Sequence, residues 1–111
     1  MSRPMLSAGG SALLRKLLER AADDRKRFLL SSWTSVDWQS MTFTGERHQA
    51  CFRVLGPDAM AIAKRWTAGL EDAEFDLGPT RFVADIALTE QPREDDVDAV
   101  ILSLEALTIA S

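Results

Sequence analysis

The sequence predicts an α+β fold in the order α-ββ-α-ββ, with a four-stranded antiparallel sheet, on the basis of three observations. Apolar residues recur at helical spacing in two separate stretches. Apolar and polar side chains alternate, as in strands, both before and after the second helical stretch. The connections within each strand pair are too short for a parallel crossover, so the strands are antiparallel. We expect the second helix on one face of the sheet and the N-terminal helix on the other face or at an edge.

The chain is predicted to start with a flexible arm, because its first ten residues contain a proline and two consecutive glycines and show no periodicity. A single α+β domain then covers residues 11–111. Ser11 is placed to cap the first helix, and leucines and alanines continue its apolar stripe. The helix is expected to reach about Leu30.

A first hairpin is predicted from a strand that runs from about Thr34 to Thr44 and then turns at Gly45-Glu46. Direct pairing across that turn separates an apolar core face from a more polar outer face, which supports the register. Trp38 then points outward opposite Arg53, where the cation could stack on the ring. The predicted core face of this hairpin consists of Met41, Phe43, Ala50, Phe52 and Val54.

The second helix and the second hairpin follow. Gly56-Pro57-Asp58 ends the preceding strand and starts the helix, and Gly69 ends it. A strand from Arg81 to Thr89 leads through a charged loop into the last strand. The two hairpins can be placed side by side in more than one way. Alternation assigns Phe82, Ala84, Ile86 and Leu88 to the core face of the third strand, and Val83 and Asp85 to its outer face.

The last strand, Ala99 to Ala110, is apolar on both faces, with Ser103 and Glu105 as the polar interruptions. A strand with one face in water should alternate apolar and polar residues. The second face must therefore be covered by another helix or by another copy of the protein. One face carries Val100, Leu102, Leu104 and Ala106, and the other carries Ile101, Leu107 and Ile109.

Composition excludes several classes of protein. The net charge of −4 offers no excess of lysine and arginine for binding nucleic acid. No apolar run is long enough to span a membrane, and the N-terminal region does not resemble a signal peptide. The single cysteine, Cys51, suits a reducing compartment, so we expect a cytoplasmic protein.

Few residues suggest chemistry. His48 is the only histidine, and no metal-ligand, CxxC, phosphate-loop or Ser-His-Asp spacing accompanies it. We interpret His48 as a structural residue beside a turn and Cys51 as a half-buried outer-face thiol. The sequence predicts no metal and no cofactor, and it favours a non-catalytic function.

The first functional hypothesis is a protein-protein interaction or assembly module that forms a homodimer or binds a protein partner. The doubly apolar last strand and the outward Trp38 motivate it. Contact would involve the outer sheet face or an unpaired edge. The interface candidates are Trp38, Arg53, Val83, Ile101, Leu107 and Ile109.

The alternative is a small-ligand-binding protein or small enzyme with a pocket between the sheet and a helix. Asp85, Glu105 and Trp38 would line that pocket. The predicted register places Ser103 opposite Asp85 and Val83 opposite Glu105, so the two carboxylates are diagonal neighbours.

Overall fold

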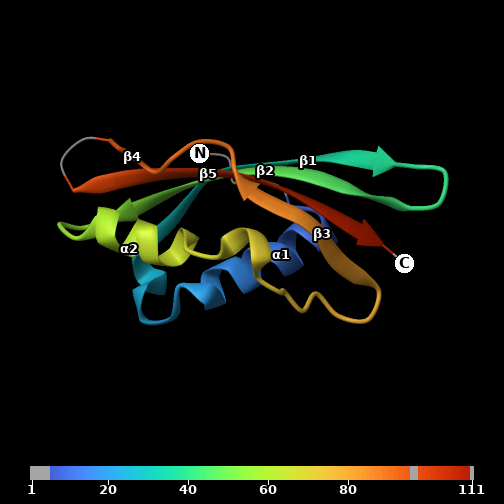
Figure 1. Ribbon diagram of the computed structural model, residues 1–111, viewed down its shortest axis with the longest axis horizontal. Coiled ribbons are helices and arrows are strands. Elements are labelled where there is room, and N and C mark those ends of the chain that lie inside the picture. The colour runs from blue at the N-terminus through green and yellow to red at the C-terminus, as the bar shows by residue number, and fades with distance from the viewer. Residues whose placement is uncertain (1–5, 96–97, 111) are drawn as a thin grey trace.

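The computed structural model describes residues 6–95 and 98–110 and confirms an α+β fold with an antiparallel sheet (Figure 1). The sheet has five strands in this part of the chain, one more than expected, because a two-residue strand pairs beside the last one. The elements are α1 (Ala8–Arg20), the 3-10 helix η1 (Ala22–Arg27), β1 (Phe28–Gln39), β2 (Thr44–Leu55), α2 (Ala59–Thr67), the 3-10 helix η2 (Leu70–Asp72), β3 (Arg81–Leu88), β4 (Arg93–Glu94) and β5 (Ala99–Ala110).

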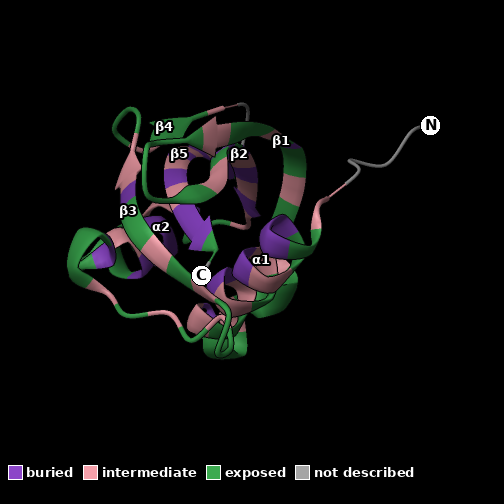
Figure 2. Ribbon diagram, turned by 90° about the vertical axis from the view of Figure 1, so that its right-hand side faces the viewer, coloured by how far each residue is buried: buried purple, intermediate pink, exposed green. Residues whose placement is uncertain are grey.

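Strand β5 lies in the middle of the sheet, whose order is β1-β2-β5-β3. It pairs along its whole length with β2, from Thr44 opposite Ala110 to Leu55 opposite Ala99. On its other side it pairs with β3 and β4. This central position explains why the last strand is so rich in apolar residues. Figure 2 shows buried residues recurring along β5.

Both helices cover the same face of the sheet, as Figure 1 shows. Trp66 of α2 donates its ring N–H to the carbonyl oxygen of Leu17 in α1, at 3.1 Å. The rings of Phe28 and Phe52 lie 5.3 and 5.9 Å from that of Trp66, so sheet and helices share one core. The expectation that the N-terminal helix covers the opposite face or an edge is therefore wrong, because its leucine stripe joins the core built around Trp66.

The opposite face carries no helix in the described residues, and we call it the outer face. The strand registers assign the following residues to it: Leu29, Ser32, Thr34, Val36 and Trp38 of β1; Gly45, Arg47, Gln49, Cys51, Arg53 and Leu55 of β2; Ala99, Ile101, Ser103, Glu105, Leu107 and Ile109 of β5; Phe82, Asp85 and Ala87 of β3.

Helix α1 begins earlier and ends sooner than the sequence predicts. Its N-cap is Ser7, whose hydroxyl accepts the backbone N–H of Gly10 at 3.0 Å, so Gly9 and Gly10 are helical and not part of an arm. Residues 1–5 of the predicted arm lie outside the described residues. Ala22 has a φ of 52°, a left-handed conformation that an α-helix cannot contain, and β1 follows from Phe28.

The first hairpin turns at Ser40–Phe43, and the predicted turn at Gly45-Glu46 is wrong. The N–H of Ser40 donates to the carbonyl oxygen of Phe43 at 2.9 Å, and the Ser40 hydroxyl accepts the N–H of Phe43 at 3.0 Å. These local bonds close a turn that the glycine signal does not reveal. Met41 and Phe43 are therefore exposed at the hairpin tip. Phe28 and Trp33 take their place in the core beside the correctly predicted Ala50, Phe52 and Val54.

A bulge in β3 changes which side chains face the core. Val83 lies opposite Thr108 and Asp85 opposite Leu107, which leaves Ala84 as the extra residue. Val83 consequently packs against the core and is absent from the outer face, contrary to prediction. Phe82, predicted in the core, is exposed on the outer face, whereas Ile86 and Leu88 contact the core as expected.

Candidate functional site

The most distinctive surface is the end of the outer face nearest the hairpin tip. In one cross-strand row, Trp38, Gly45, Ile109 and Phe82 follow one another on four adjacent strands. Gly45 has no side chain, so Ile109 is flanked by two aromatic residues and is only 3% exposed. The next row adds apolar side chains on β1 and β5. We call Val36, Trp38, Phe82, Leu107 and Ile109 the apolar end.

Large apolar side chains in this region are accessible to a partner. Val36 is 66% and Phe82 46% exposed, and at the adjoining hairpin tip Met41 is fully exposed and Phe43 about half exposed. Figure 1 shows the β1–β2 hairpin projecting beyond the helices at this end of the molecule. Contiguous exposed apolar surface is typical of interaction sites. Sequence reasoning missed Val36 and Phe82, although the alternation of Val36 and Trp38 with polar neighbours carried the signal for the first.

The rest of the outer face is more polar. Arg47 and Asp85 lie on either side of Leu107, and the middle rows carry Thr34, Gln49, Glu105, Ser32 and Ser103. Cys51 faces outward, as predicted, with the Ser103 hydroxyl 3.9 Å from its sulfur. The middle of the face is thus polar, and exposed apolar side chains occur at both ends: most of them at the apolar end, and Leu29, 48% exposed, beside Arg53 at the other.

Arg53 and Ile101 lie near the opposite end of this face. Arg53 is opposite Leu29, and its guanidinium forms an ion pair of 3.4 Å with Asp95. Trp38 is opposite Gly45 instead. The predicted stacking of Arg53 on Trp38 is therefore wrong, because the hairpin turn lies further toward the N-terminus than predicted.

His48 lies in the core, where it is completely buried. Its Nδ1 lies 2.7 Å from the Ser35 hydroxyl and 3.3 Å from the ring nitrogen of Trp33, and its Nε2 lies 2.9 Å from the Thr108 hydroxyl. The Trp33 ring N–H donates both to the Ser35 hydroxyl at 3.1 Å and to Nδ1, so Nδ1 accepts and Nε2 carries the proton. Burial lowers the pKa of His48 below its ordinary value of 6.5, and Glu46 partly opposes this effect. These contacts support a structural role.

Asp85 and Glu105 lie on neighbouring strands of the outer face, opposite Leu107 and Ala87 respectively. The predicted partners Ser103 and Val83 do not face them. Trp38 lines a cavity of about 400 Å³ together with Asp37, Glu46 and Arg81, and neither Asp85 nor Glu105 lines it. The structure therefore does not bring the three residues into one pocket between the sheet and a helix.

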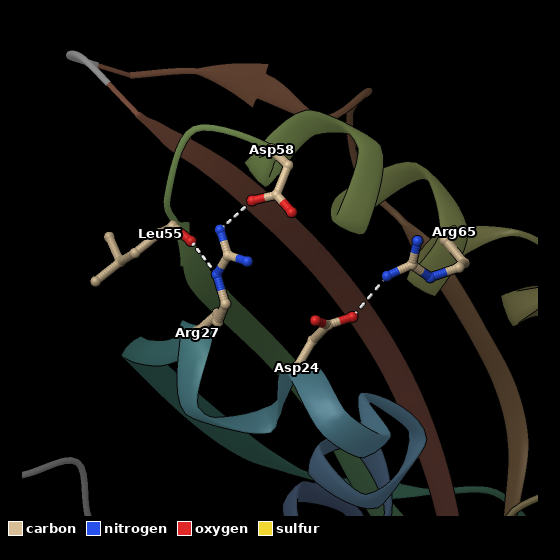
Figure 3. A network of polar contacts seen from close by, with 5 residues as sticks. All are labelled: Asp24, Arg27, Leu55, Asp58 and Arg65. Atoms are coloured by element: carbon tan, nitrogen blue, oxygen red, sulfur yellow. Dashed lines mark hydrogen bonds and ion pairs between the residues drawn. The ribbon is translucent and has the colours of Figure 1, made fainter.

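A polar network joins η1 to the corner between β2 and α2 (Figure 3). Arg27 donates to the carbonyl oxygen of Leu55 at 2.7 Å and forms an ion pair with Asp58, while Arg65 and Asp24 lie 2.6 Å apart. The hydrogen bond from Arg27 lowers the pKa of the Asp58 carboxyl. These contacts connect η1 to the end of β2 and to α2, and they stabilise the fold.

Two further properties concern the described residues only. They contain no group of three or more histidine, cysteine, aspartate or glutamate side chains placed to hold a metal ion. None of the helices within residues 6–95 and 98–110 has the length and apolar character needed to cross a membrane.

Comparison with known proteins supports the fold. No protein family matches this sequence, and no curated protein does. Among solved structures, the chain is similar to one described as part of the virion of a native gene transfer agent (GTA) particle, with a TM-score of 0.50 and 20% sequence identity. The similarity covers 75% of this chain and 68% of that chain. At this identity it shows a shared fold.

Proposed function

We propose that this protein is a non-catalytic assembly module that self-associates at the apolar end of its outer face and the adjoining strand β1. The observation that carries this proposal is the exposure of Val36 and Phe82 at the apolar end, on a sheet face that no helix of the described residues covers. Both helices are already used on the other face, so a second protein surface is the means of covering these side chains.

Two further observations support an assembly role. The similar solved chain belongs to a virion, which is built from many protein subunits. The net charge of −4 favours protein over nucleic acid as the partner, and the single cysteine suits the cytoplasm. We do not propose the ligand-binding alternative, because Asp85 and Glu105 lie away from the cavity that Trp38 lines.

The test is the oligomeric state of the purified chain, measured by native mass spectrometry and sedimentation over a wide range of concentration. We expect a dimer or larger assembly, and we expect Val36→Asp to weaken it at least about tenfold in Kd, since burying a charge costs well over 1.4 kcal/mol. Gln49→Asp, on an exposed residue in the polar middle of the same face, is the matched control and should leave association unchanged. A wild-type monomer at every concentration would refute the proposal.

A further inference from the structure

Strand β1 is an open edge of the sheet. It pairs only with β2 in the described part of the chain, and its other side offers unpaired backbone groups over a strand of 12 residues. Proteins commonly protect such edges with proline, with lysine or with other charged side chains. Strand β1 contains no proline, glycine, lysine or arginine, and Asp37 is its one charged residue.

The opposite edge of the sheet is better protected. Strand β3 has eight residues, a bulge at Ala84, and the charged residues Arg81 and Asp85. A bulge interrupts the regular backbone spacing that a new strand would need. Strand β1 has one register irregularity of its own, between Leu30 and Ser32, but its pairing with β2 is regular from Ser32 to Gln39. The two edges are therefore unequal, and this regular part of β1 is the one suited to receive another strand.

The hydrogen bonding at the hairpin turn shows which backbone groups of β1 are free. Ser40 and Phe43 form a hydrogen-bonded pair. In an antiparallel ladder, hydrogen-bonded and non-hydrogen-bonded pairs alternate, so residues 38, 36, 34 and 32 direct their backbone groups toward β2. Their neighbours Trp33, Ser35, Asp37 and Gln39 direct theirs outward, away from the sheet.

A second copy of β1 can pair with these groups about a two-fold axis. Antiparallel pairing of identical strands keeps the outer faces of both copies on the same side. An axis at Asp37 would place two carboxylates directly opposite each other, which is unfavourable. An axis at Val36 places Ser35 opposite the second copy's Asp37. It also buries two valine side chains, each 66% exposed in the single chain, against each other.

We propose that two copies of this chain join through β1 in an antiparallel pair centred on Val36, which gives one continuous sheet across the dimer. This inference rests on the proposed function and identifies β1 as the edge through which two copies join. The contact covers Val36, whereas Phe82 on β3 lies outside it. In this register, Trp33 lies opposite the second copy's Gln39, and every free backbone group of residues 33, 35, 37 and 39 gains a partner. The partner recognised here is the chain itself.

Disulfide cross-linking tests the register. The two Val36 residues would form a non-hydrogen-bonded pair with Cα atoms about 4.5 Å apart, which is within the range of a disulfide. In a Cys51→Ser background, we expect Val36→Cys to form a covalent dimer under mild oxidation. Thr34→Cys in the same background is the matched control, because Thr34 would lie opposite the second copy's Trp38 and not opposite a second Thr34. On denaturing electrophoresis without a reducing agent, this variant should run as a monomer.

A proline substitution tests the edge itself. Asp37→Pro removes an outward-facing backbone N–H without removing a bond to β2, and Asp37→Thr removes the charge but keeps the N–H. We expect Asp37→Pro to weaken dimerisation at least tenfold in Kd, and Asp37→Thr to dimerise as well as the wild type or better. Circular dichroism establishes that both variants are folded.

The outcomes separate this inference from the proposed function. If the wild type self-associates but Val36→Cys gives no covalent dimer, the β1 pairing is wrong and the assembly role stands. The β1 pairing is also wrong if folded Asp37→Pro associates as tightly as Asp37→Thr. It is wrong as well if the wild type forms a ring with an odd number of subunits, because such a ring cannot be built from two-fold pairs alone. If the wild type is monomeric throughout, both proposals fail.

Discussion

Individual polar side chains are placed in this core only where hydrogen bonds compensate for their burial. His48 and Thr108 are both almost completely buried, and each side chain bonds to the other. Trp33 and Ser35 complete the set on the other side of the imidazole ring. Because a buried polar group without a partner costs free energy, this arrangement fixes the neutral tautomer of His48. Protonation of His48 is therefore linked to the stability of the fold.

We expect acid to destabilise the wild type partly through His48. Burial lowers its pKa in the folded chain below the ordinary value of 6.5, so the unfolded chain binds more protons between the two values. The free energy of unfolding is then fully retained above the unfolded-state pKa and decreases as pH falls toward the folded-state pKa. Urea unfolding at several pH values between about 7.5 and 5 measures this slope.

The matched comparison uses His48→Gln, which keeps polar atoms but does not titrate. The variant should be less stable than the wild type at neutral pH by about 1–3 kcal/mol, since the hydrogen bonds of a buried group are disturbed. Its stability should depend less on pH in this window. Identical slopes for the two proteins would contradict the assignment of the titration to His48.

At the scale of elements, short connections with unusual backbone geometry decide how strands and helices meet. Gly56, between β2 and α2, has a φ of 115°, which side-chain-bearing residues rarely adopt. A Cβ atom at this position would lie 1.7 Å from Nη2 of Arg27. The glycine therefore makes room for the arginine that holds η1 to Leu55 and Asp58.

We expect Gly56→Ala to destabilise the protein more than Gly78→Ala. Both glycines have positive φ, so both substitutions strain the backbone by about 1–3 kcal/mol. Nothing lies within 4 Å of a Cβ at Gly78, whereas at Gly56 the Arg27 side chain must also move. Urea unfolding of the two variants measures the difference. Equal losses of stability would show that the Arg27 contacts contribute nothing measurable.

For the whole molecule, the position of each strand in the sheet determines how strongly its backbone is protected. Strand β5 is paired on both sides, and β2 lies between β1 and β5. Strand β1 is paired on one side only and carries the exposed Val36. Opening of the sheet should therefore start at β1 in a single chain, and association at β1 should suppress it.

Hydrogen-deuterium exchange at low and high protein concentration checks this expectation. At low concentration the peptide covering residues 28–39 should exchange much faster than that covering 99–110. At high concentration, protection should increase in 28–39, because the outward N–H groups of residues 33, 35, 37 and 39 become bonded. Protection that increases in β3 and leaves β1 unchanged would point to a different contact.

Local patterns in the sequence determined the class of the fold and most of its core. The α+β class, the antiparallel pairing and the start of the second helix after Gly56-Pro57-Asp58 follow from periodicity and turn chemistry. The outward placement of Trp38, Leu107 and Ile109 was also predicted, since a period of two assigns a face to every strand residue. These features depend on neighbours in the chain.

Only the tertiary structure decided the turn, the bulge and the placement of the helices. The Ser40 hydroxyl closes the turn, and one extra residue at Ala84 reverses the alternation of β3, which moved Phe82 outward and Val83 inward. The sequence placed Gly9 and Gly10 in a flexible arm. A Cβ at Gly10 would come within 2.9 Å of Trp33, so the glycines let α1 approach the sheet on the face that α2 also covers. Packing between distant residues thus left the outer face open.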